Sequence, residues 1–167
     1  MRRAQILFLV KFFLILIVAY LVIAWNPVND RVIVPFTQGL ARSAGAILHV
    51  LGEPVTVRGT VVSGSRFGVN INNGCNGVEA MLILLASIVA FPASMKARAV
   101  GLILGAIAIQ VLNEIRIVTL YLLGAYHPRV FDMFHTAVWQ IVIIAAAILF
   151  FLAWSSRVVS NGLATRA

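Results

Sequence analysis

The sequence predicts an all-α polytopic membrane protein with four transmembrane helices, an extracytoplasmic interfacial helix and a short β-hairpin. Of its 167 residues, 62% are hydrophobic, and the mean hydropathy is +1.02. Both values are far above those of an ordinary soluble domain, and several apolar runs are long enough to cross a bilayer. No linker or low-complexity stretch interrupts the chain. Residues 1–167 are therefore expected to form a single integral-membrane domain.

Four membrane spans are expected, over about residues 6–25, 76–92, 99–123 and 136–154. The first follows a basic start, which is also typical of a cleaved signal peptide. Its apolar stretch is long for a signal peptide, however, and no small-residue cleavage site follows it. We therefore expect a retained anchor.

Two further elements are expected between the first and second spans. Pro27 ends the first helix, and Pro35 is expected in the loop that follows. Residues 37–51 have the pattern of an amphipathic helix lying in the membrane interface, with an apolar face of Leu40, Ala44, Ile47, Leu48 and Leu51. Residues 55–72 alternate with a period of two on both sides of "SGSR", which predicts a β-hairpin. An open hairpin has unpaired edges and so belongs outside the hydrocarbon.

The formal charge of +8 comes mostly from basic residues that flank the apolar runs. Such residues set orientation in the membrane, so nucleic acid is not an expected partner, whereas membrane lipid is. The basic groups that we expect in the cytoplasm are Arg2 and Arg3 at the N-terminus, Lys96 and Arg98 in a loop, and Arg157 and Arg166 in the tail. This topology places both termini inside. Cys75, the hairpin and the loop over residues 124–135 then face the extracytoplasmic side.

Cys75 is the only cysteine and stands in the polar turn "INNGCNGVEAM". One cysteine excludes an internal disulfide, and three isolated histidines lack the spacing of a zinc site, so no metal or organic cofactor is expected. Gly74 and Gly77 allow a tight turn, and the start of a helix favours a thiolate and offers amides to an oxyanion. The alternative is an inert packing residue.

Arg116 lies about seven residues from the outer end of its helix at Leu123, which corresponds to roughly 10 Å of depth. Charges at such depth usually face a bundle interior or a water-filled cavity. Asn113, three residues earlier, shares that face, so the pair is expected to form a polar site wall. Glu114 points elsewhere and is expected to pair with another helix. A structural ion pair is the alternative.

A cysteine nucleophile needs a proton-transfer partner, and histidine is the usual one. His135 begins the last span at the level of Cys75, which favours it, while His127 before Pro128 remains open. His49, on the interfacial helix, is expected to be exposed. Glu79 follows Cys75 by four residues and is expected on the same helix face, where it could orient Arg116 or a water, or form a buried salt bridge.

Three segments together resemble the exosortase and archaeosortase family. "NNGCNGVEAM" resembles its cysteine motif, "NEIRIVTLYLLG" its Asn-x-x-Arg segment and "FHTAVWQ" its histidine motif. The resemblance covers about residues 40–150, and the short chain is similar to the small exosortase H type. Asn76 departs from the pattern, because many relatives carry serine there.

The resemblance implies a membrane-embedded cysteine transpeptidase or protease in a bacterial inner membrane. Such enzymes cleave C-terminal sorting signals of exported proteins, made of a short motif, a transmembrane helix and a basic tail, through a thioester acyl-enzyme. Cys75 would be the nucleophile, His135 the general acid/base, and Arg116 the oxyanion or substrate-binding cation. The residues expected to bind substrate or support the site are Asn113, Glu79, Asn76 and Gly77.

The residues alone leave other functions open. Hydrolysis without transfer shares the same acyl-enzyme step. A non-catalytic membrane scaffold or chaperone for exported proteins would need no reactive thiol, and in a small transporter subunit the polar face of the fourth span would line a path. In both of the last two cases Cys75 would be inert.

Overall fold

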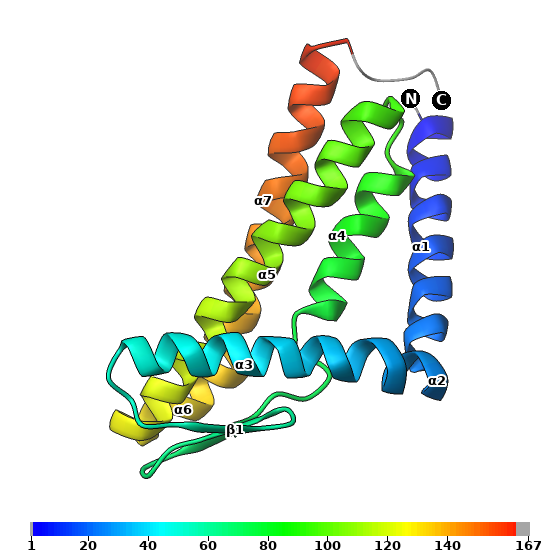
Figure 1. Ribbon diagram of the computed structural model, residues 1–167. Coiled ribbons are helices and arrows are strands. Elements are labelled where there is room, and N and C mark those ends of the chain that lie inside the picture. The colour runs from blue at the N-terminus through cyan, green and yellow to red at the C-terminus, as the bar shows by residue number, and fades with distance from the viewer. Residues whose placement is uncertain (1, 163–167) are drawn as a thin grey trace.

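The computed structural model describes residues 2–162 and shows a bundle of helices with a layer of other elements across one end (Figure 1). The helices that run lengthwise are α1 (Arg2–Ala24), α4 (Val78–Ala90), α5 (Met95–Tyr126) and α7 (Trp139–Ser160). The helix α3 (Val34–Val50) lies across one end of this bundle, beside a small sheet. We call α3 and this sheet the cross-layer. The helix predicted over residues 37–51 is therefore present, and its position in the membrane interface stays a prediction.

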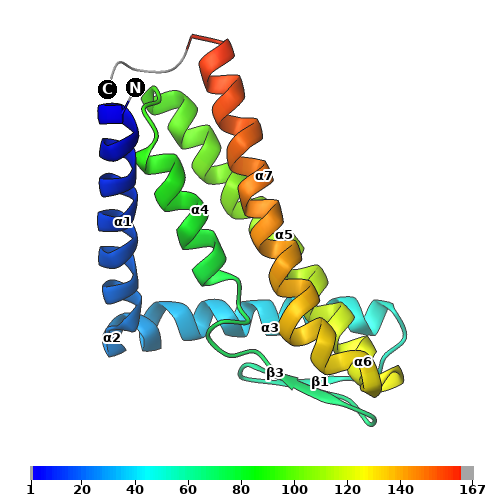
Figure 2. The same cartoon turned by 180° about the vertical axis from the view of Figure 1, so that it is seen from behind.

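Three helices are long and apolar enough to cross a membrane: Arg3–Ala24, Met95–Tyr126 and the continuous helix Pro128–Ser160. The span predicted over residues 76–92 is present as the shorter apolar helix α4 of 13 residues. That length corresponds to about 20 Å, less than the roughly 30 Å of a hydrocarbon core. Within residues 2–162, three helices are therefore long enough to span a membrane. Figure 2 shows α4 between α1 and α7. Helix α4 packs on both of these helices and on α5.

The loop predicted around Pro35 is wrong, because the chain from α1 to α3 is helical. It forms α2 (Asn26–Val28) and a π-helical turn, η1 (Asn29–Ile33), that continues into α3. Pro27 follows the end of α1, as predicted, but Pro35 lies in the first turn of α3. The π-helical turn directly before Pro35 interrupts the regular α-helical hydrogen-bond ladder, which accommodates a residue that has no N–H to donate.

The buried face of α3 differs from the predicted stripe. Ile47 and Leu51 are 40% and 57% exposed, respectively. The buried residues are mostly small: Thr37, Ala41, Ala44, Gly45 and Leu48. The side chain of Val57 lies against Gly45, where a β-carbon would leave no room for it. Close approach of the sheet therefore selects the small residues rather than the most apolar ones.

The sheet has three antiparallel strands instead of the predicted hairpin. They are β1 (Thr56–Arg58), β2 (Val61–Ser63) and β3 (Gly68–Asn70), in the order β1-β2-β3. The "SGSR" reversal joins β2 to β3, as predicted. A second reversal at Gly59, with φ of +60°, splits the first predicted strand in two. Glycine accepts this left-handed conformation, which produces a two-residue turn between paired Arg58 and Val61.

The loop predicted over residues 124–135 is also mostly helical. α6 (Pro128–Met133) and the π-helical turn η2 (Phe134–Val138) lead without a break into α7. The chain departs from helical geometry at His127, with φ of −136°, where α5 ends. The helix carrying His135 thus begins seven residues before that histidine, not at it.

Two hydrophobic clusters hold the fold together, and α5 contributes to both. One lies between α3, the sheet and the C-terminal part of α5, and it includes Leu48, Val62, Ile71 and Tyr121. The other lies among α4, α5 and α7 and includes Leu84, Ile88 and Ile109. The chain between β3 and α4 joins these clusters, so it is anchored at both ends.

Candidate active site

Cys75 lies in the loop between β3 and α4, half-buried. Its backbone N–H donates to the carbonyl of Asn72 at 2.9 Å. Gly74 and Gly77 have φ of +86° and +75°, so the turn uses both glycines as the sequence predicts. The helix itself begins only at Val78. Cys75 therefore stands on a short turn in front of the helix, not on its first residue.

Three polar side chains from distant parts of the chain meet at this turn. Cys75 Sγ lies 3.5 Å from His135 Nε2. The guanidinium of Arg116 reaches the same sulfur, with Nη2 at 3.9 Å. Arg116 is only 4% exposed, so its charge faces the protein interior. The structure thus brings together the three residues predicted to carry the chemistry.

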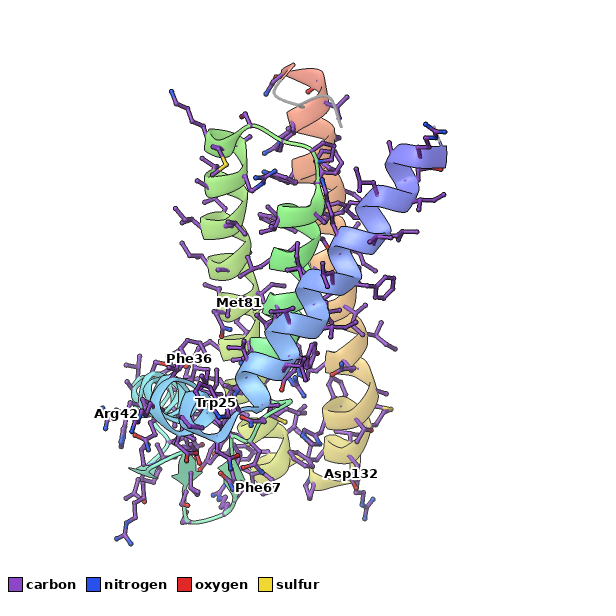
Figure 3. The ribbon with its side chains drawn as sticks, turned by 90° about the vertical axis from the view of Figure 1, so that its right-hand side faces the viewer. Trp25, Phe36, Arg42, Phe67, Met81 and Asp132 are labelled. Carbon is purple, nitrogen blue, oxygen red and sulfur yellow. The ribbon has the colours of Figure 1, made fainter. Side chains whose placement is uncertain are left out.

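The three side chains share one cavity of about 260 Å³. Its walls are β3, the Cys75 loop, α5 and the α6–η2 helix. It lies at the cross-layer end of the molecule, where Figure 3 shows Phe67 and Asp132. The other lining residues are Phe67, Gly68, Val69, Asn70, Ile71, Ile117, Leu120 and Phe131. The cavity is therefore a mainly apolar chamber with its reactive groups gathered at one place.

Two aromatic residues of the site were not anticipated from the sequence. The ring of Phe131 stacks on that of His135, with centroids 5.5 Å apart and planes within 9°. Phe67 packs edge-on against Phe131 at 5.1 Å. The sequence feature that could have predicted this stacking is the four-residue spacing of Phe131 and His135, which places both on one helix face. It went unused because that segment was expected to be a loop.

Asn113 is fully buried and packs against the Cys75 turn. A β-carbon on Gly77 would lie 2.9 Å from its Cγ, so the two residues touch closely. Within residues 2–162, no protein group hydrogen-bonds to either amide atom of Asn113 or to Nε of Arg116. Arg116 lines the cavity but Asn113 does not, so only the arginine of the predicted polar wall faces the site, and Asn113 keeps unused hydrogen-bonding capacity beside the turn.

Asn76 and Glu79 support the turn from outside the cavity. The buried amide of Asn76 donates to Thr37 Oγ1 at 3.0 Å and accepts from the N–H of Val78 at 3.1 Å. Glu79 Oε1 accepts from the N–H of Gly74 at 2.9 Å. The expectation that Glu79 shares a helix face with Cys75 is wrong, because Cys75 precedes the helix. Glu79 instead holds the glycine turn.

The remaining charged and imidazole groups lie elsewhere. Glu114 accepts a hydrogen bond from Ser43 of α3 at 2.8 Å, so it contacts another helix, as predicted. His49 and His127 are exposed and do not line the cavity. Of the three histidines, His135 alone reaches Cys75, which decides between His135 and His127 on geometry. The catalytic role of His135 stays a prediction.

This fold and this site define a class: a helical membrane protein with a cysteine, a buried arginine and a histidine in one cavity at an end of its bundle. A family model described as transmembrane exosortase matches residues 3–154. The match covers nearly the whole chain, so the protein belongs to the transmembrane exosortase family. Members of this family are cysteine transpeptidase-like membrane proteins that act on exported proteins with sorting signals. No curated protein and no solved structure matches the chain.

Proposed function

We propose that this protein is a membrane-embedded cysteine transpeptidase or protease that cleaves C-terminal sorting signals from exported proteins. The observation that carries the proposal is the contact of one thiol with two partners: His135 Nε2 at 3.5 Å and Arg116 Nη2 at 3.9 Å. A thiol that only fills space needs neither a base nor a cation. Both are what a thiolate nucleophile requires.

In the proposed reaction, His135 takes the proton of the Cys75 thiol, and the thiolate attacks the carbonyl carbon of the scissile peptide. Arg116 stabilises the negative charge that develops on the carbonyl oxygen, inside a cavity where such a charge is poorly screened. His135 then gives its proton to the leaving amine, and the C–N bond breaks. The product is a thioester on Cys75. An acceptor amine or a water molecule attacks this thioester and regenerates the thiol.

The arrangement in the membrane follows from the same proposal. α4 and its flanking residues complete a fourth crossing, since they connect the cross-layer end to the opposite end of the bundle (Figure 1). The site then lies at the outer face of a bacterial inner membrane, where an exported protein presents its recognition motif.

The test is co-expression with an exported reporter that ends in a short motif, an apolar helix and a basic tail. Wild type is expected to remove the tail, and Cys75→Ala to leave it intact. His135→Ala should lower the rate by roughly 10²-fold or more, as expected for loss of a general acid/base. The matched control, His127→Ala, changes an exposed histidine outside the cavity and should cleave at close to the wild-type rate.

Immunoblots follow the reporter, and the mass of its new C-terminus separates hydrolysis from transfer. Cleavage that survives Cys75→Ala would overturn the proposal. Absence of cleavage with several classes of tail, with enzyme and reporter both inserted in the membrane, would favour a non-catalytic scaffold or chaperone for exported proteins.

A further inference from the structure

We propose that the free edge of β3 binds the substrate, whose recognition segment adds to the sheet as a further strand beside Cys75. The inference rests on the proposed function, because it concerns how the same site holds its peptide. It adds a recognition mode: the peptide is held in an extended conformation by its main chain.

β3 is the last strand of its sheet. The order is β1-β2-β3, so in the described part of the chain β2 is the strand that pairs with it. Edge strands are usually protected against further pairing by charged residues, prolines or a covering element. Two of the three residues of β3 are Gly68 and Asn70, which carry neither a charge nor a ring, and both are exposed. This edge therefore lacks the usual protection.

The register fixes which backbone groups of β3 are free. The carbonyl of Phe67 accepts from Gly64 at 2.8 Å, and the N–H of Ile71 donates to Thr60 at 3.0 Å. Val69 is paired with Val62 between them. In an antiparallel ladder the backbone groups of alternate residues point to opposite sides. Those of Phe67, Val69 and Ile71 point to β2, so the N–H and C=O groups of Gly68 and Asn70 point away from it.

These free groups lie at the site. Gly68 and Asn70 line the same cavity as Cys75, Arg116 and His135. A peptide whose carbonyl reaches Cys75 must pass through this cavity, and an extended peptide presents N–H and C=O groups with the same two-residue repeat. Pairing with an exposed edge is an established way to bind peptides, with affinity from main-chain hydrogen bonds and specificity from alternate side chains. The cavity wall of Phe67, Leu120 and Phe131 would receive an apolar side chain.

Proline substitutions test the free N–H groups. The N–H of Asn70 is not used within the sheet, so Asn70→Pro should leave the ladder intact and remove one donor for the substrate. Its matched control is Asn70→Ala, which loses the same side-chain contact with Thr60 but keeps the N–H. We expect Asn70→Pro to cleave the tailed reporter about tenfold more slowly than Asn70→Ala. Gly68→Pro and Gly68→Ala form a second pair with the same expectation.

Cross-linking tests the same contact without catalysis. In a Cys75→Ala protein, Asn70→Cys provides a single thiol at the edge. A reporter series carries one cysteine at successive positions before its apolar helix, and disulfides are scored after mild oxidation. We expect cross-links at every second position, because alternate side chains of a paired strand lie on one face. Thr56→Cys, at the opposite edge of the sheet, should give none of this pattern.

The outcomes separate this inference from the proposed function. If wild type cleaves the reporter, equal rates for the proline and alanine variants together with cross-links lacking alternation overturn strand addition alone. If wild type cleaves no tail but alternate cross-links form, the edge binds peptide and the proposed chemistry fails. If neither cleavage nor cross-links occur with any tail, both are overturned. Should a proline variant be unstable, the cross-linking pattern decides.

Discussion

At the scale of single residues, Arg116 combines near-complete burial with contact to the thiol. Its guanidinium is a planar fork of donors, whereas lysine is a compact point charge on a flexible stem. We expect Arg116→Lys to lower tail cleavage by roughly 10²-fold, because the oxyanion would lose a positioned donor. Initial rates in isolated membranes measure this effect. Wild-type rates in both Arg116→Lys and Arg116→Gln would show that the cation does not stabilise the reaction.

Gly74 and Gly77, the two glycines of the Cys75 turn, can be compared by how far an alanine at each position lowers the free energy of unfolding. Both have positive φ, so an alanine at either should cost about 1–2 kcal/mol in backbone conformation. A β-carbon on Gly77 would also lie 2.9 Å from Asn113 Cγ, whereas one on Gly74 would meet nothing within 4 Å. Gly77→Ala should therefore lower the free energy of unfolding further than Gly74→Ala, as measured by thermal denaturation in detergent.

The steric part of this difference has its own control. Asn113→Gly added to Gly77→Ala removes the clash, including the contact with Asn113 Cβ at 3.0 Å, but not the conformational cost, so its loss relative to Asn113→Gly should match that of Gly74→Ala. Equal losses in the two single glycine variants would contradict the tight contact between Gly77 and Asn113.

Several site residues could be predicted from local rules. The depth of Arg116 was sufficient to place it at the cavity, whereas Asn113, three residues earlier, packs against Gly77 and does not line the cavity. His135 could not be separated from His127, because both lie near the outer ends of apolar runs and only the fold brings one of them to Cys75. Glu79 was misplaced because a helix start was expected two residues too early. Position relative to a helix start is the least certain feature of a turn that is rich in glycine.

At the scale of elements, the hydrogen bond from Asn76 to Thr37 ties α3 to the start of α4. Thr37→Val should leave one N–H of the Asn76 amide without an acceptor, while the amide keeps its bond to Asn73 Oδ1 at 3.3 Å, and lower the free energy of unfolding by about 1–3 kcal/mol. Thr37→Ser keeps the hydroxyl and serves as the control, with a smaller loss expected. Thermal denaturation and cleavage rates measure the effect. Equal stability of the two variants would show that the link contributes nothing.

Apolar runs and their ends predicted the long helices well, because burial in a bilayer leaves few alternatives for the backbone. The short elements were harder. Pro35 was assigned to a loop, although a helix can hold a proline where a π-helical turn interrupts its regular hydrogen-bond ladder. The alternation of residues 55–61 looked like one strand, since a two-residue turn at Gly59 preserves much of the pattern on either side. These errors come from turns, whose geometry depends on a single residue.

At the scale of the whole molecule, the long helix α5 connects the membrane region to the site. Its 32 residues correspond to about 48 Å, well beyond the hydrocarbon thickness. Its inner part packs in the bundle cluster, and its outer part, including Ile117 and Tyr121, packs under the sheet. Arg116 lies just before this outer part. One rigid helix thus fixes the height of the site relative to the membrane.

The same arrangement predicts the orientation of the molecule. Figure 1 shows the start of α1, the α4–α5 connection and the end of α7 at one end of the bundle, opposite the cross-layer. The basic residues in these segments are Arg2, Arg3, Lys96, Arg98 and Arg157, without an acidic residue among them, while Arg166 lies outside the described residues. The cross-layer end also carries basic residues, Arg31, Arg42, Arg58, Arg66 and Arg129, but there they are mixed with Asp30, Glu53, Glu79 and Asp132. Basic flanks favour the cytoplasm.

We therefore expect the cross-layer and the Cys75 cavity to face outward, where an exported protein can reach them. In a Cys75→Ala background, Ser65→Cys places a thiol on the exposed turn between β2 and β3, and Met95→Cys places one at the opposite end, where Met95 is 73% exposed. A membrane-impermeant maleimide should label Ser65→Cys in intact spheroplasts and Met95→Cys only after permeabilisation. The reverse pattern would place the cavity in the cytoplasm, which would separate its thiol from any exported substrate and overturn the proposed reaction on its natural target.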